Sequence, residues 1–492
     1  MPSLSPGAGG AEPGHGRRWW RWLALAAVCY LLYFSGLSAV GLLGPDEPRY
    51  AAIGREMARS GDWITPRLWG EPWFEKPPLL YWMTALAFRL GLGDDLAPRL
   101  PVALVSVAFL VFFYRTLRRE FGEPAAWYAT AVLGTSAGWL AFSRVGVTDL
   151  PMSAAFSAAM LLMLPWIARG ERRGLAAAAL LLGLAVLAKG LVPLALALPA
   201  VWLGRRRLGD WIRPAPVAAF LLAALPWYAL MTARHGSAFL SEFFLVHHFG
   251  RVYTEALRHM QPFWFYLPVF VAGLFPWTPL LGLLFRRKLY QDARARLFLL
   301  WLAFGIVFFS LSLNKLPGYL LPLLPAVSAL AGLGLAEARG TRWLLAAAGV
   351  LLAAIPVAID ALPGALARGL TRAQPGGVSW PFLAAALLAA AWCWWQAERR
   401  RRWAVAAVVA GMCAGVVSLQ VRAYPLLDRG VSVRAFWREN PGVAREACLE
   451  GVDRDRRYGL NYYSRQPLAE CAVAPRPLRI RETPAGRLYI AE

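Results

Sequence analysis

Long apolar runs recur along the first 421 residues of the chain, and short arginine-rich clusters separate them. Runs of roughly 18 or more apolar residues have the length of a helix that crosses a lipid bilayer. Of the 492 residues, 58% are hydrophobic and 16% are charged, which is too apolar for a soluble protein of this length. The pattern predicts a polytopic α-helical membrane protein.

The net charge of +23 would suggest a nucleic-acid partner in a soluble protein. Here the excess lies in arginine clusters between the apolar runs, where membrane topology requires it. We therefore expect no nucleic-acid partner. The first apolar run is too long for a cleavable signal and is followed by many others, so we interpret it as a span.

The arginine clusters also predict the topology, because short loops rich in Lys and Arg stay cytoplasmic. Arg17, Arg18 and Arg21 place the N-terminus inside. Residues 175–203 are apolar with arginines on both flanks, so we predict two short helices there, with Lys189 at the outer turn. We predict about thirteen spans and an outer C-terminus, with the spans at 22–43, 99–115, 124–142, 150–167, 175–188, 190–204, 215–233, 263–285, 296–313, 317–336, 342–360, 380–397 and 403–421.

Two further helices are predicted in the first outer loop, residues 44–98. In residues 49–61, Tyr50, Ile53, Gly54 and Met57 share one face and Arg49, Arg55, Glu56 and Arg59 lie elsewhere, which suits a helix along the membrane surface. Residues 77–93 are apolar but short, and we interpret them as a re-entrant or interfacial helix.

The tail, residues 422–492, is polar and arginine-rich and has no spanning run. Within it, "PLRIRETPAGRLYIA" has apolar stretches on both sides of Pro-Ala-Gly, as in a hairpin. We predict a small outer α+β domain after a transmembrane domain of residues 1–421. Because outer compartments are oxidising, we expect a Cys448–Cys471 disulfide; the alternative is two unpaired thiols.

Acidic, basic and histidine side chains gather at the predicted outer ends of the spans. Ionisable groups close to a bilayer are expensive and tend to mark functional sites. The set comprises Asp46, Glu47, Glu75, Lys76, Arg144, Asp149, Lys189, His247, His248, Arg251, Asn314, Lys315 and Tyr319.

This mixture suits a phosphate-bearing substrate at the membrane. Lys and Arg bind phosphate through charge-assisted hydrogen bonds, and carboxylates ligate a divalent cation or accept a proton. The chain has no nucleotide-binding signature, and an outer site has no nucleotide available. The activated group must therefore arrive on a lipid, for which a polyprenyl phosphate sugar fits.

Several motifs resemble one family. "DEPRY" and "FEKPPLLYW" in the first outer loop, with "RVGVTDLPM", "LAKGLVP", "HHFGRVY" and "NKLPGYLLPLLP", are similar to those of the aminoarabinose transferases (ArnT). These are C-type membrane glycosyltransferases related to protein O-mannosyltransferases. The resemblance covers about residues 1–330 well.

The resemblance implies an inverting glycosyltransferase of the bacterial inner membrane, monomeric, with its N-terminus cytoplasmic and its C-terminus periplasmic. It would move a sugar from undecaprenyl phosphate to a lipid A, glycan, lipid or protein acceptor. Asp46 and Asp149 match acidic positions near the reaction centre. Glu75 would hold one divalent cation (Mg²⁺, Mn²⁺ or Zn²⁺), with His247 or His248 as second ligand. The carrier phosphate and substrate cavity would involve Lys76, Lys189, Arg251, Lys315 and Tyr319.

Each candidate also has a structural alternative. Asp46 and Asp149 fit helix caps, and Lys189 and Lys315 fit side chains that extend to the interface without a ligand. The histidines fit ordinary loop residues. Glu47 and Arg49 fit a local pair on the surface helix.

Three rival functions remain at this point. A lipid or lipid-linked-sugar transporter also has many spans and buried charge, although transporters place charges near the midplane and show paired halves. A protein O-mannosyltransferase would use a hydroxyl acceptor and Asp46 as a true base. A structural membrane protein has no need for such a one-sided set of acids and lysines.

Overall fold

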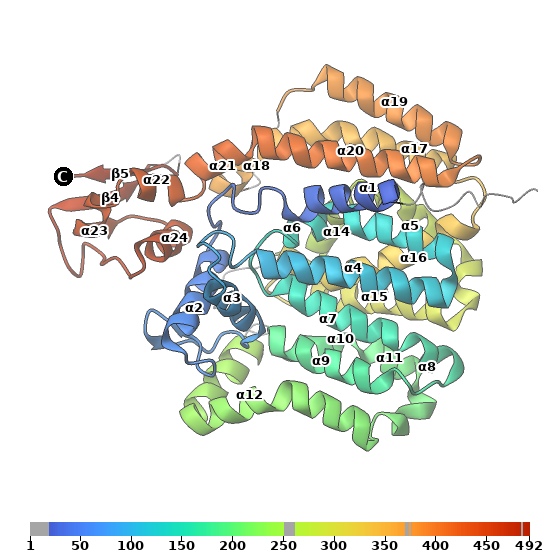
Figure 1. The fold of residues 1–492 in the computed structure, drawn as a ribbon, viewed down its shortest axis with the longest axis horizontal. Helices are drawn as coiled ribbons and strands as arrows, with labels where there is room; N and C mark the ends of the chain where they lie inside the picture. Colours follow the sequence, from blue (N-terminus) through green and yellow to red (C-terminus); the bar gives the residue numbers. More distant parts are fainter. Residues whose placement is uncertain (1–18, 250–260, 370–372, 375, 484–485) are drawn as a thin grey trace, which may run out of the picture.

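The computed structural model describes residues 19–249, 261–369, 373–374, 376–483 and 486–492, without the side chains of residues 248, 249 and 368. Most helices lie side by side in one bundle, while α2, α3 and the C-terminal strands project from one end of it (Figure 1). Seven helices in the described part are long and apolar enough to cross a membrane, or eight if one bent pair is a single span. The chain is a multi-span helical protein. The long apolar helices account for seven or eight of the thirteen predicted spans.

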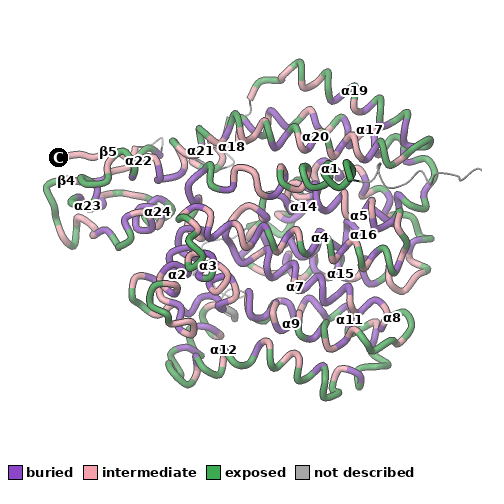
Figure 2. The backbone as a smooth tube through the Cα atoms, in the orientation of Figure 1, coloured by how far each residue is buried: buried purple, intermediate pink, exposed green. Residues whose placement is uncertain are grey.

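Seven predicted spans coincide with long helices. The most buried contain α7 (Asp149–Leu162) with α8 (Leu164–Arg169), and η8 (Pro317–Leu323) with α16 (Leu324–Glu337), whereas α12 (Pro214–Leu240) lies at the margin of the bundle (Figure 2). The other long helices are α4 (Leu100–Phe121), α15 (Ala293–Leu311), α17 (Arg342–Leu351) with η9 (Leu352–Ala354) and α18 (Ile355–Arg368), and α20 (Arg401–Arg422) with α21 (Tyr424–Gly430).

Other predicted spans correspond to shorter helices. Residues 175–203 break at Gly190 as predicted, because α9 (Leu175–Lys189) ends before Gly190 (φ 83°). The short apolar helix Val192–Leu203, which begins with α10 (Val192–Leu196), follows. The remaining elements are α1 (Trp19–Cys29), η1 (Tyr30–Phe34), α5 (Glu123–Thr135), α6 (Ala137–Phe142), α11 (Leu198–Leu203), η2 (Arg205–Asp210), η3 (Ser241–Phe249), η7 (Arg287–Gln291) and α19 (Trp380–Gln396).

The span predicted at 263–285 is sharply bent in the structure. η5 (Phe263–Phe265) and α14 (Tyr266–Leu274) meet η6 (Thr278–Phe285) at a 110° bend. Phe275 precedes Pro276 and is extended (φ −50°, ψ 137°), as a residue before proline prefers. Its carbonyl accepts a hydrogen bond from the Ala137 N–H at 2.9 Å, so the break also anchors the start of α6.

Residues 44–98, the predicted first outer loop, do not contain the surface-lying helix that the sequence predicted. α2 (Asp46–Ser60) forms but is largely buried, and Arg49 and Arg55 are buried with it. α2 packs between α3 (Leu79–Arg89) and α24 (Arg454–Ser464), while β1 (Arg67–Leu68) and β2 (Glu71–Pro72) pair beside it. The helix forms where its amphipathic pattern predicts it. Arg49 and Arg55, which the pattern places on a solvent-facing side, instead form ion pairs with residues outside the helix.

The tail folds around its own hydrophobic cluster, which includes Val433, Leu449, Leu460 and Ile480. β4 (Leu478–Glu482) pairs in parallel with β3 (Ala447–Glu450) and antiparallel with β5 (Leu488–Ala491). α22 (Arg434–Glu439), α23 (Val443–Glu446) and α24 complete it.

The tail is held to residues 44–98 by buried and part-buried polar contacts. The Tyr463 hydroxyl donates to Asp95 at 2.6 Å, Arg434 pairs with Asp95 at 2.6 Å, and the Tyr462 hydroxyl donates to the Asp94 carbonyl at 2.7 Å. The tail therefore packs against a segment that lies some 370 residues earlier in the sequence.

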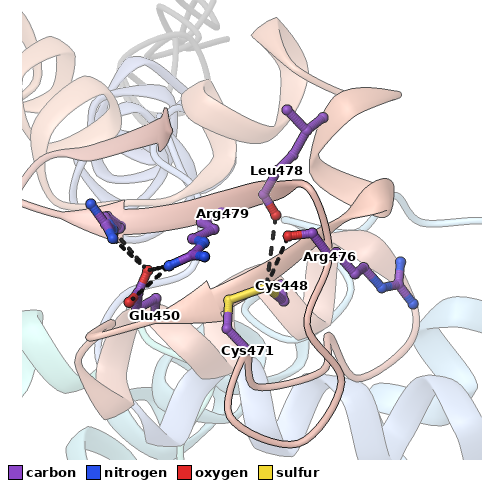
Figure 3. The surroundings of a disulfide bond; sticks show 7 residues. Cys448, Glu450, Cys471, Arg476, Leu478 and Arg479 are labelled. Carbon is purple, nitrogen blue, oxygen red and sulfur yellow. Dashed lines mark hydrogen bonds and ion pairs between the residues drawn. A yellow bond between two sulfur atoms is a disulfide. The ribbon is translucent and has the colours of Figure 1, made fainter. Parts of the chain in front are cut away.

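The predicted Cys448–Cys471 disulfide is confirmed; it joins β3 to the segment before β4 (Figure 3). The two cysteines are 23 residues apart, and a crosslink of that span stabilises a fold by about 2–4 kcal/mol. We expect the Cys448→Ser, Cys471→Ser double variant to be cleaved faster by trypsin in its arginine-rich tail. The measure is the rate of limited proteolysis, with Cys413→Ser as the control; equal rates would contradict the expectation.

Candidate functional site

The first turn of α2 contributes Asp46 and Arg49 to a series of ion pairs in which acidic and basic side chains alternate. Arg49 pairs with Asp46 one turn before it and with Glu75 at 3.3 Å, and Glu75 pairs with Lys76 at 3.1 Å. The Asp46 side chain is 43% exposed, whereas those of the other three are no more than 10% exposed. Asp46 is therefore the acid of this cluster that an incoming substrate can reach.

Arg49 is fixed from several sides. Its guanidinium carbon lies 5.0 Å from the ring centre of Tyr458 in α24 and 5.3 Å from that of Trp73. Burial lowers its pKa, but Glu75, Tyr50 and Asp46 outweigh burial and leave the pKa above its usual value. The alternative of a local Glu47–Arg49 pair is not formed in the described residues, because Glu47 binds Arg99 instead. The i,i+3 spacing of Arg49 from Asp46 is the signal in the sequence that could have revealed the observed pair.

A second cluster lies at the start of α7. Lys189, the last residue of α9, donates to the Asp149 carboxylate at 2.5 Å, and its ammonium lies 5.0 Å from the ring centre of Tyr319. Gly318 is packed so closely that an added Cβ would lie 2.3 Å from an Asp149 oxygen. Three predicted site residues, Asp149, Lys189 and Tyr319, are thus brought together from three distant segments.

The structural alternative for Asp46 and Asp149, a helix cap, is not formed. α2 begins at Asp46 after Pro45, α7 begins at Asp149 after Thr148, and neither helix has a side-chain cap hydrogen bond. The two carboxylates instead contact the cations Arg49 and Lys189.

The two clusters are connected through Glu47. Glu47 is 1% exposed and holds Arg99 with two hydrogen bonds of 2.6 and 2.7 Å. It also accepts the Gly146 N–H at 2.9 Å, three residues before Asp149, and the Leu43 N–H at 2.9 Å. Glu47 is therefore structural, and it fixes the loop carrying Asp46 against the loop carrying Asp149.

Arg99 is the residue that the sequence reasoning missed altogether. Besides Glu47, it donates to the carbonyls of Leu37, Val40 and Gly41 at 2.5–3.0 Å. Nothing in the sequence around Arg99 distinguishes it from the arginines in the clusters between the apolar runs. Its role depends on an acid 52 residues away.

The remaining candidates are placed as follows. Lys315 is buried between η8 and α15 and donates to the carbonyls of Ser312 (2.5 Å) and Gln261 (3.0 Å); burial lowers its pKa. His247 lies 3.8 Å from Glu242, an acid that we did not predict. Arg251 and the side chain of His248 lie outside the described residues. The described residues contain no group of three His, Cys, Asp or Glu side chains suited to a metal.

Comparison with known proteins places this arrangement in context. Residues 75–230 match the family model described as dolichyl-phosphate-mannose-protein mannosyltransferase. Two curated relatives are undecaprenyl phosphate-alpha-4-amino-4-deoxy-L-arabinose arabinosyl transferases. That of Pseudomonas fluorescens is 35% identical over 335 residues, and that of Pseudomonas aeruginosa is 35% identical over 330. Each alignment covers 64% of this chain but only 57% and 60% of the relatives.

The fold is also shared with solved structures. ArnT from Cupriavidus metallidurans bound to undecaprenyl phosphate superposes with a TM-score of 0.76 at 25% identity, over 94% of this chain and 93% of that one. The arabinosyltransferase EmbB from Mycobacterium smegmatis matches with a TM-score of 0.53 at 16% identity, over 88% of this chain and 45% of that one, which shows a related fold only.

Proposed function

We propose that this chain, which is ArnT-like in sequence and in fold, is an inverting glycosyltransferase. It moves a sugar from a polyprenyl phosphate carrier to an acceptor at the periplasmic face of the inner membrane. The observation that carries the proposal is the pair of acid–cation clusters, Asp46–Arg49–Glu75–Lys76 and Asp149–Lys189, which Glu47 joins. The undecaprenyl phosphate seen in the Cupriavidus ArnT supports the carrier class.

The clusters suit departure of a phosphate. As the bond from sugar to carrier breaks, negative charge develops on the phosphate, and cations fixed in advance stabilise it. We assign this role to Lys76, Lys189 and Arg49, and extend it to Arg251, Lys315 and Tyr319 from the family resemblance. Asp46 and Asp149 face the sugar. A hydroxyl acceptor gives its proton to Asp46, whereas a phosphate acceptor is already ionised and needs only positioning.

The acceptor is the part of the reaction that the relatives' names define least. The curated relatives and the family model name two donors, a sugar on undecaprenyl phosphate and mannose on dolichyl phosphate, and the family model names one acceptor, protein. We propose that the acceptor is lipid A, a glycan, another lipid or a protein hydroxyl. Purified chain in lipid vesicles, given radiolabelled undecaprenyl phosphate sugars and a bacterial membrane extract, is expected to transfer label to the extract. If the sugar donor is not consumed while a labelled lipid crosses the bilayer, the chain is a transporter instead.

Lys189 is expected to matter for the rate. Lys189→Met removes a fixed cation from the Asp149 cluster, and loss of one such group typically lowers turnover by about 10²–10³-fold. The control is Lys288→Met, an exposed lysine in η7. Both variants are compared by kcat for sugar transfer and by thermal unfolding. An unchanged kcat in Lys189→Met would show that Lys189 only neutralises Asp149.

A divalent cation held by Glu75, His247 and His248 is a separate proposal. In the described residues the Glu75 carboxylate contacts Arg49 and Lys76, and the His248 side chain lies outside the described residues. No step above passes through a metal. The test is metal analysis of the purified protein before and after Glu75→Gln. A metal content that Glu75→Gln leaves unchanged would contradict this ligand set.

We also propose about thirteen crossings, a monomer, a cytoplasmic N-terminus, and a periplasmic tail domain of residues 422–492 after the transmembrane domain 1–421. The disulfide supports an oxidising location for the tail. Periplasmic reporter fusions after residue 492 are expected to be active, and cytoplasmic reporters there inactive.

A further inference from the structure

A basic pocket lies where the first outer loop meets the tail, away from the acid–cation clusters. It has a volume of about 380 Å³. It is lined by four arginines and one acid from three segments: Arg55 and Arg59 of α2, Arg89 of α3, Asp94, and Arg465 just after α24. At 1.5 Å per helical residue, Arg55 and Arg59 lie roughly 14 and 20 Å along α2 from Asp46.

The charge of this pocket is not balanced. Asp94 pairs with Arg55 at 3.3 Å and with Arg465 at 3.6 Å. Among the described residues, no carboxylate lies within ion-pair distance of Arg59 or Arg89. Four guanidinium groups and one carboxylate give a net charge of about +3 in a single cavity. Like charges that line one pocket repel one another, and a bound anion offsets that repulsion.

Two of the arginines are held in place. Arg55 is buried, donates to the Tyr462 carbonyl at 2.7 Å and lies 4.2 Å from the Tyr462 ring centre. Arg89 donates to the Ala58 carbonyl at 3.2 Å and lies 5.4 Å from the Trp63 ring centre. Both side chains therefore lose little freedom when they bind an anion.

Arg465 adds an independent sign of a site. It ends α24 in the left-handed conformation (φ 64°), a position where glycine or asparagine is preferred and other residues are strained. In this conformation the Arg465 side chain lines the same pocket and lies 3.6 Å from the Asp94 carboxylate.

We propose that this pocket binds a phosphate-bearing group, such as a lipid headgroup or a free phosphate. Several guanidinium groups around one cavity match the charge and the planar, paired hydrogen bonding that phosphate takes. Its distance from Asp46 separates it from the carrier phosphate at the reaction centre. The pocket thus goes beyond the proposed transfer reaction and does not depend on it.

The test measures binding without any sugar donor. The full chain in phosphatidylcholine nanodiscs is titrated with dihexanoyl phosphatidic acid, with dihexanoyl phosphatidylcholine and with inorganic phosphate. The Arg59→Gln, Arg89→Gln double variant removes two arginines of the pocket. Its matched control is Arg429→Gln, Arg487→Gln, which removes two exposed arginines of the tail that lie outside the pocket.

Phosphatidic acid is expected to bind wild type and the control alike, and to bind the pocket variant at least about tenfold more weakly, because two charge-assisted contacts are lost. If inorganic phosphate shows the same dependence and the lipid binds no better, the pocket takes free phosphate. Arg465→Gly is a second variant that relieves the strained backbone while removing a guanidinium, and it is expected to weaken binding as well. Equal binding by wild type and both pocket variants, or no binding of either phosphate probe by wild type, would overturn the proposal.

Discussion

Replacing Asp46 with asparagine is expected to lower the rate of sugar transfer by about 10²–10⁴-fold, the range typical of a group that acts on the proton or charge of the reacting centre. The fold should tolerate the change. Asp46 makes no cap hydrogen bond, is 43% exposed, and its pair with Arg49 is of the partly exposed kind that contributes up to about 1 kcal/mol. A large loss of rate with little loss of stability is therefore the signature of a reacting group.

The measurement is kcat for carrier-dependent transfer, alongside thermal unfolding of the same preparation. Glu71→Gln is the matched control, because Glu71 is an exposed carboxylate of the same loop. If the Asp46→Asn variant transfers sugar as fast as the Glu71→Gln variant, Asp46 has no role in the reaction. Asp46→Glu is expected to recover part of the rate, since it restores the charge.

Arg99→Ala is expected to destabilise the protein by about 3–5 kcal/mol, the usual effect of leaving one partner of a buried ion pair without its counter-charge. It would strand Glu47, which is 1% exposed, and three backbone carbonyls that Arg99 now satisfies. Because Glu47 joins the loops of Asp46 and Asp149, the residual folded protein is also expected to lose transfer activity.

Thermal unfolding in detergent and the yield of folded protein measure this effect. Arg118→Ala is the control, as Arg118 is an exposed arginine near the other end of the same helix, α4. If Arg99→Ala and Arg118→Ala unfold at the same temperature, the buried pair does not hold the two loops together.

The positions of the helices were largely predictable from the chain itself. A helix that crosses a bilayer must be apolar over most of its length, and arginine clusters separate the apolar runs of this chain, so composition and spacing alone locate candidate spans such as α4, α15 and α20. The bend at Phe275–Pro276 was missed because hydropathy averages over proline and registers no change in direction. Its signal was the proline itself.

The buried state of α2 could not be predicted in this way. Its pattern of apolar and charged residues is that of a surface helix, and Arg49 and Arg55 enter the interior because Glu75, Asp94 and Tyr462 receive them. Two of those partners come from elsewhere in the loop and one from the tail. Periodicity describes one helix, whereas burial depends on what packs against it.

The sequence by itself determined the class of the protein, the positions of its long apolar helices and the residue types of the candidate site, because each of these follows from local composition or from a motif. Only the tertiary structure decided the partners. It assigned Arg49 to Asp46 and Glu75, Lys189 to Asp149, and Glu47 to Arg99. Those choices rest on long-range contacts between charges in a low-dielectric interior, where an acid binds the cation that the folded chain brings to it rather than the nearest one in sequence.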